Sequence, residues 1–263
     1  MSYFEAVYAA LMATEPLVKR ALIDQLYQSA AVPDFSQPHL PVVPFAAPGR
    51  PIKPELIDPR DVPHRGLGTQ AGRAAMCHAV AHIEFNAINL ALDACYRFRD
   101  MPTQYYVDWL SVAWDEARHF SLLVDRMALM GCSYGDYRAH NGLWDMAVRS
   151  DHDVLVRMAL VPRVLEARGL DVTPGMIRRL TGANDPETVA VLKVILAEEV
   201  RHVEIGSHWY QFLCQQRGLD HESYFLELLA EYDTQVKLPM NEKARAEAGF
   251  SAEELRKLNA TFS

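Results

Sequence analysis

The sequence is poor in cysteine, and its cysteines do not occur at the spacing of metal sites. Four of the 263 residues are cysteine, and no two form a Cys-x-x-Cys motif: Cys77, Cys95, Cys132 and Cys214. Rubredoxin-type iron centres and zinc ribbons need such motifs, so the sequence excludes both kinds of site. Scattered single cysteines also favour a reducing compartment.

Long apolar runs and a surplus of basic residues are lacking as well. No stretch approaches the roughly 18 uncharged apolar residues of a membrane-spanning helix. The first apolar residues include Glu5 and follow no basic residue, unlike a secretory signal peptide. The formal net charge of -8 argues against a general nucleic-acid binder, because phosphate recognition needs clustered Lys and Arg. We therefore expect a cytoplasmic protein that binds neither nucleic acid nor membranes.

Proline is concentrated in one early segment, residues 32–68. Nine prolines there exclude regular helix and interrupt any sheet. We expect residues 1–68 to form an N-terminal helix, divided or started at Pro16, and then an extended strap packed on the rest of the chain. A disordered linker is the alternative, but the segment contains apolar residues that can anchor it: Phe35, Leu40, Val42, Val43, Phe45, Leu56 and Ile57.

Four long helical segments follow the strap, and nothing has the pattern of a strand. We expect helices at about 69–99, 103–130, 143–168 and 185–217, separated by proline and glycine. The roughly twelve residues between the second and third can cover about 40 Å when extended, enough to join two helical hairpins by a long crossover. Residues 69–217 are thus the predicted core, and residues 218–263 a C-terminal extension with helices near 221–237 and 251–260.

A motif with metal-binding geometry occurs twice within this core. Glu116-x-x-His119 lies in the second predicted helix and Glu199-x-x-His202 in the fourth. Helical residues three apart lie about 60° apart around the axis and about 4.5 Å along it, so both side chains can reach one ion. Glu84 precedes Glu116 by 32 residues, and Glu166 precedes Glu199 by 33. The chain therefore repeats one unit, as two related helical hairpins would.

The six polar side chains of this repeat all fall within apolar helical stripes. Surface glutamates with incidental histidines would explain one motif, but not four inward-facing carboxylates. Without cations these carboxylates would have to take up protons, whereas two divalent ions balance four negative charges. Carboxylates and imidazoles suit iron, with manganese or a mixed pair as alternatives. The predicted ligands of two iron ions are Glu84, Glu116, His119, Glu166, Glu199 and His202.

Three longer motifs carry a resemblance to known proteins: WDEARHF, LVPRVLEARGLDVTP and EEVRHVEIGSHW. Together with the repeat, they resemble the ferritin-like superfamily of di-iron carboxylate proteins. They are most similar to the bacterial family catalogued as domain of unknown function 455, from about Gly66 to the fifth helical segment. The resemblance implies an all-α, ferritin-like four-helix bundle with a di-metal site. It also implies that Glu116 and Glu199 are the bridging ligands.

Several neighbouring residues receive less specific interpretations. His78 and His82 share another helical face, which predicts a polar stripe against the strap or another subunit. Pro162, one turn before Glu166, removes a helical hydrogen bond and is expected to bend its helix, as a packing kink rather than a functional one. Arg118 and Arg201 occupy matching positions in the two halves, and we expect them to form ion pairs between helices.

Three functions are compatible with such a centre. The first is an oxidase or hydroxylase that uses O2, an external electron donor and an unidentified small organic substrate. The second is a ferroxidase, iron-handling or peroxide-scavenging protein, although the missing Cys-x-x-Cys motifs count against a self-contained rubrerythrin. The third is a structural metal-binding module. A homodimer is compatible with all three.

Overall fold

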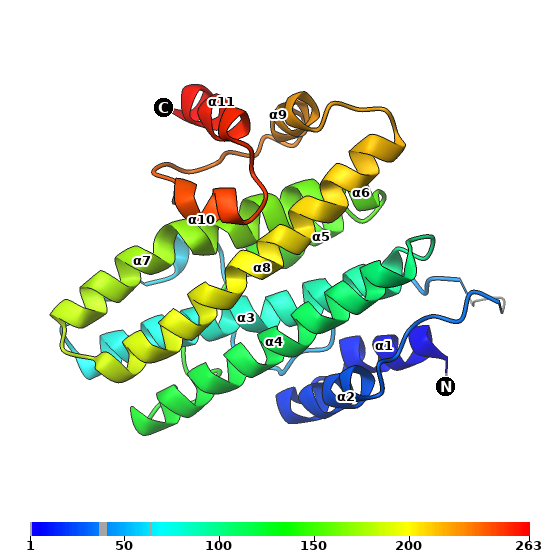
Figure 1. Ribbon diagram of the computed structural model, residues 1–263. Coiled ribbons are helices and arrows are strands. Elements are labelled where there is room, and N and C mark those ends of the chain that lie inside the picture. The colour runs from blue at the N-terminus through cyan, green and yellow to red at the C-terminus, as the bar shows by residue number, and fades with distance from the viewer. Residues whose placement is uncertain (1, 37–40, 64) are drawn as a thin grey trace. The chain divides into compact units, whose positions relative to one another are not determined.

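The computed structural model describes residues 2–36, 41–63 and 65–263 of the chain. Over these residues the fold is all-helical, and no strand is present beyond one isolated bridge between Leu56 and Ala139. The chain forms two compact units, Met1–Val148 and Arg149–Ser263, which are described separately (Figure 1). None of the helices in the described ranges is long and apolar enough to cross a membrane.

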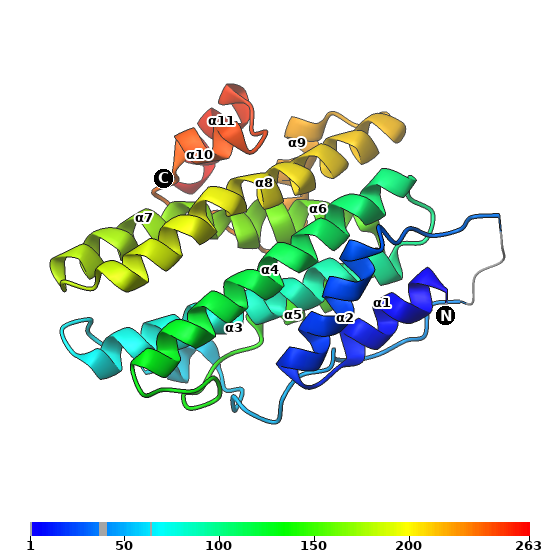
Figure 2. The ribbon, with the colours of Figure 1, turned by 60° about the horizontal axis from the view of Figure 1, so that its bottom comes forward.

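A long helical hairpin forms the centre of the first unit. Helix α3 (Gln70–Arg97) and helix α4 (Thr103–Leu129) confirm the expected helices at 69–99 and 103–130 to within two residues. The Thr69 side chain caps α3 by accepting the Gly72 N–H, and the Tyr106 hydroxyl closes the turn between the helices by donating to the Phe98 carbonyl. The two helices lie side by side and antiparallel in both views (Figure 2).

Two shorter helices cover this hairpin. Helix α1 (Tyr3–Met12) packs on α3, and helix α2 (Pro16–Gln28) packs on α4. Pro16 starts α2, as the sequence predicts, because proline is well suited to a first helical turn. The buried ammonium of Lys19 donates to the carbonyls of Ala10 and Leu11 and to Asn89 Oδ1. It thereby closes the C-terminal end of α1 and joins both short helices to α3.

The proline-rich segment runs along this unit with little regular structure. Its one helical turn in the described ranges is the 3-10 turn Pro59–Asp61. Trp144 Nε1 donates to the Ala46 carbonyl, and the Phe45 ring lies 6.0 Å from the Trp144 ring. Two of the expected anchors are about half exposed, since Phe35 is 47% and Val43 is 52% exposed. Leu40, another expected anchor, lies outside the described residues.

The segment between α4 and the short helix α5 (Gly142–Arg149) is held against α3 by two histidines. His78 Nε2 accepts the Gly135 N–H at 2.9 Å. His82 lies between the Tyr134 hydroxyl, 2.9 Å from Nδ1, and the His140 carbonyl, 3.1 Å from Nε2. The polar stripe therefore faces this connecting segment, a neighbour that the sequence did not suggest.

The third predicted helix, 143–168, is wrong in its bounds. Helix α5 ends at Arg149, and a new helix, α6 (Val154–Leu160), starts where the Asp153 side chain accepts the Leu155 N–H. Asp153 is also paired with Arg217, 64 residues away, at 2.6 Å. The helical path then continues through a wide turn, Val161–Glu166, into helix α7 (Ala167–Gly182). Gly169 and Pro174 do not end it, because α7 buries an apolar face: Ala167, Leu170 and Leu180.

Helix α8 (Pro186–Gln216) returns antiparallel to α7 and confirms the expected helix at 185–217 (Figure 2). Three shorter helices complete the second unit: α9 (His221–Glu231), α10 (Glu242–Glu247) and α11 (Ala252–Phe262). Helix α9 is six residues shorter than predicted, and α10 was not predicted. Asp233 has a positive φ of 47° just after α9, which is incompatible with a continuing right-handed helix.

Candidate metal centre

Three of the predicted ligands meet in the core of the first unit. His119 Nδ1 on α4 lies 3.2 Å from Glu84 Oε2 on α3 and 3.5 Å from Glu116 Oε2 on its own helix. All three side chains are buried, and each offers one ligand atom within 4.8 Å of the other two. We call Glu84, Glu116 and His119 the first triad.

Helical phase explains why these side chains turn inward. Glu116 and His119 lie one turn apart on the buried face of α4, together with Val112 and Leu123. Glu84 lies on the buried face of α3, whose apolar residues at helical spacing include Val80. Packing of α3 on α4 therefore brings the three polar groups to the same place.

Electrostatics in the first triad favour positive charge. Burial lowers the pKa of His119, but hydrogen bonds and charges from Glu116 and Glu84 outweigh burial and raise it to about 11. With this pKa, the His119 imidazole keeps its proton unless a metal cation replaces that proton. With the proton in place, two carboxylates and one imidazolium still leave a net negative charge. A divalent cation fits both the charge and the mixed oxygen and nitrogen donors.

The other three predicted ligands all lie in the second unit. Glu199 and His202 stand one turn apart on α8, with His202 Nδ1 3.7 Å from Glu199 Oε2, and both are buried. Glu166 is also buried and is the last residue of the wide turn that leads into α7. We call these three residues the second triad; it has the same composition as the first.

The wide turn before Glu166 is a short π-helical segment, and it is associated with a close helix contact. Pro162 has no N–H to donate, which favours a local departure from α-helical bonding. A Cβ atom on Gly206 of α8 would lie 2.2 Å from Pro162 Cβ, so only glycine permits this approach. The sequence predicted a bend at Pro162, and the structure shows a π-helical segment there. The sequence feature that could have indicated the close helix contact is the presence of Pro162 on one segment and of Gly206, one turn beyond His202, on the other.

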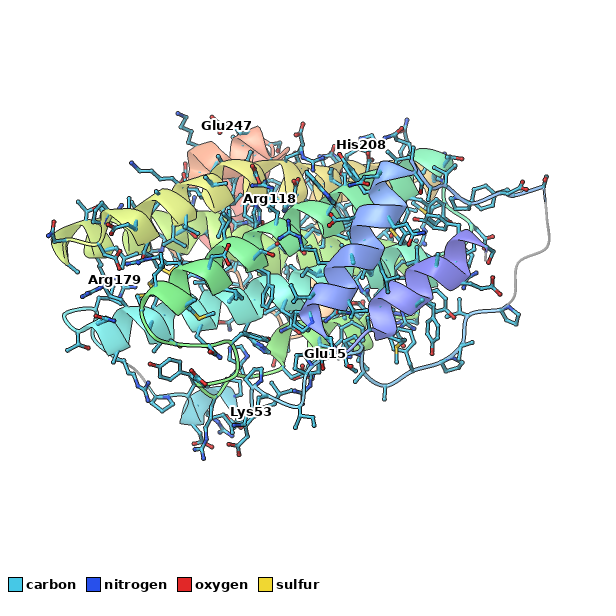
Figure 3. All side chains as sticks on the ribbon, turned by 90° about the horizontal axis from the view of Figure 1, so that it is seen from below. Glu15, Lys53, Arg118, Arg179, His208 and Glu247 are labelled. Atoms are coloured by element: carbon cyan, nitrogen blue, oxygen red, sulfur yellow. The ribbon has the colours of Figure 1, made fainter. Side chains whose placement is uncertain are left out.

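Two charged residues beside the first triad pair along their helix. Arg118 Nη2 lies 3.5 Å from Asp115 Oδ1, three residues earlier on α4. Figure 3 labels Arg118 on this helix. This ion pair lies within α4, and the pairs between helices that the sequence suggests stay a prediction.

Sequence comparisons identify similar proteins without describing an activity. The family described as "Protein of unknown function (DUF455)" matches residues 12–256. An uncharacterized protein from Haemophilus influenzae is 43% identical over 266 residues, covering 96% of this chain and 92% of that protein. No solved structure shows significant similarity.

Proposed function

The chain belongs to the family of unknown function DUF455, and we propose that it is a di-iron oxidase or hydroxylase acting on a small organic substrate. The observation that carries this proposal is the first triad, in which two buried carboxylates and an imidazole offer ligand atoms within 4.8 Å of one another. A cluster of this composition is costly to bury without a cation, and it has the donors that iron prefers.

The proposal includes a four-helix arrangement of ferritin-like type. The hairpin of α3 and α4 would face the hairpin formed by α6, α7 and α8, so that the two triads share one centre. The first triad, Glu84, Glu116 and His119, and the second triad, Glu166, Glu199 and His202, would together hold the two irons. The nearly equal spacings of 32 and 33 residues and the burial of all six side chains support this arrangement.

The residues of the two triads would perform distinct tasks. Two ferrous ions, when bound, supply electrons for the reduction of dioxygen. The four carboxylates keep the centre neutral, and the complete burial of Glu116 and His119 keeps bulk water away. Hydroxylation would convert a substrate C–H, O2, two electrons and two protons into C–OH and water. An external donor would provide the electrons that return the centre to its ferrous state.

Anaerobic titration with ferrous iron, followed by exposure to oxygen, tests this function. The wild type should bind two irons per chain and consume oxygen. Glu116→Gln preserves side-chain size but removes a ligand charge, so it should bind fewer than two irons and react much more slowly. Glu198→Gln, one residue from a proposed ligand on α8, is the matched control and should behave as wild type. Fewer than two irons in the wild type, or full activity in Glu116→Gln, would contradict the proposal.

A further inference from the structure

Arg163 is fully buried within the wide turn, three residues before Glu166. Its guanidinium carbon lies 4.5 Å from the ring centre of Tyr210, 4.3 Å from that of Phe225 and 4.4 Å from that of Phe250. Its Nη2 donates to Glu254 Oε1 at 2.6 Å. Three aromatic faces and one carboxylate thus replace the water that a cation normally requires.

These partners connect the wide turn to the C-terminal helices. Tyr210 lies on α8, Phe225 on α9, Phe250 just before α11 and Glu254 in the first turn of α11. The second oxygen of Glu254 accepts the Ser251 N–H at 3.2 Å as part of the helix cap. One arginine side chain therefore joins the turn that carries Glu166 to α8, α9 and α11.

The Arg163 guanidinium has few partners, so it cannot move away from them without loss of stability. Within the described part of the chain, Nε and Nη1 of Arg163 have no hydrogen-bond partner, so the cation depends on its three rings and on Glu254. A buried charge of this kind is strongly destabilised when a partner moves away. The position of Arg163 is therefore closely tied to the packing of the C-terminal helices.

The register of the wide turn fixes the direction of Glu166 relative to Arg163. Residues three apart in an α-helix diverge by about 60°, and the wider i to i+5 turn separates them further. Pro162, next to Arg163 in the turn, is closely approached by Gly206 of α8. If the segment returned to α-helical register, Arg163 and Glu166 would not both keep their present directions.

We propose that the Arg163–Glu254 ion pair is a positioning device that holds the wide turn in the register directing Glu166 toward Glu199 and His202. The C-terminal helices thereby set the affinity of the iron position served by the second triad. This inference rests on the di-iron function proposed above. Arg163 and Glu254 act through Glu166 and need not contact iron.

Anaerobic ferrous titration of the full-length protein separates this role from a general effect on folding. Glu254→Gln should bind the first iron as the wild type does and the second iron about tenfold or more weakly. Arg163→Lys keeps a cation among the rings and should weaken the second iron less. Asp171→Asn is the matched control, because it breaks another buried pair of this unit, Arg245 Nη2 to Asp171 Oδ2 at 2.8 Å. Its second-iron affinity should remain that of the wild type.

The outcomes distinguish the inference from the function on which it rests. Two irons bound equally tightly by wild type and Glu254→Gln would overturn the positioning role and leave the di-iron function standing. Equal weakening in Glu254→Gln and Asp171→Asn would also overturn it, because the effect would then be structural. Fewer than two irons in the wild type would overturn both. If Glu254→Gln does not fold, Arg163→Lys provides the test instead. The inference is overturned if this variant binds the second iron as tightly as the wild type does.

Discussion

His119 Nδ1 on α4 lies 3.2 Å from Glu84 Oε2 on α3, and this contact joins the two central helices of the first unit at a buried polar point. The same imidazole lies 3.5 Å from Glu116 Oε2, so it is placed between two carboxylates. Most buried contacts between packed helices are apolar, because polar groups lose water on burial. The relationship is therefore more typical of a binding site than of a packing interface.

The first prediction concerns the charge on this imidazole. Glu84→Gln removes one of the two carboxylates that raise the pKa of His119, so this pKa should fall from about 11 toward its usual value. Histidine NMR titration of chelator-treated protein measures the change. Asp125→Asn alters an exposed carboxylate on the same helix and should leave the pKa of His119 unchanged. An unshifted His119 in Glu84→Gln would show that Glu84 does not determine its charge.

The second prediction concerns the contact between Gly206 and Pro162. Gly206→Ala places a methyl group 2.2 Å from Pro162 Cβ, so it should destabilise the protein by about 2 kcal/mol or more. It should also weaken binding of the second iron, since the wide turn must shift. Gly169→Ala is the control: it lies three residues after Glu166, a Cβ there meets nothing within 4 Å, and alanine favours helix by about 1 kcal/mol. Denaturant unfolding measures the stability of both variants. A Gly206→Ala variant more stable than Gly169→Ala would refute the close contact.

The third prediction concerns acid stability of the first unit. Burial, as the largest cause, lowers the pKa of His82 to about 4. The unfolded chain, with a histidine pKa near 6.5, therefore takes up this proton first as pH falls. The stability that neutral His82 contributes is complete above about pH 6.5 and is lost toward about pH 4, by up to about 3 kcal/mol.

Comparison of wild type with His82→Gln isolates this contribution from that of other titrating groups. The glutamine variant cannot be protonated, so its unfolding free energy should fall less between about pH 7 and about pH 4.5 than that of the wild type. Denaturant unfolding at the two pH values gives the difference. An identical pH dependence in both proteins would mean that His82 does not become protonated on unfolding.

Much of the fold was predictable because periodic apolar patterns are long in this chain. The bounds of α3, α4 and α8 agree with prediction to within two residues. The break before α6 was missed because Asp153 is fixed by Arg217, 64 residues away, and no local pattern reports such a contact. Conversely, Gly169 and Pro174 predicted that the helix ends near them. Helix α7 continues through both residues because its apolar face is buried against the rest of the unit.

The burial of the six proposed ligands was predictable as well. Helical periodicity alone placed six polar residues on inward faces, and all six are buried. Sequence spacing did not reveal the wide turn before Glu166, where Pro162 closely approaches Gly206 of α8. Nor did it indicate Arg163, whose partners are spread over residues 210–254. Residues that act through distant partners leave no periodic signal.

Low-temperature Mössbauer spectroscopy in an applied field, after ferrous loading and exposure to oxygen, tests the central claim most directly. If the two triads share one centre, the two ferric ions should be spin-coupled and give a diamagnetic spectrum with two irons per chain. Two uncoupled high-spin ferric ions, or a single iron per chain, would contradict a shared di-iron centre.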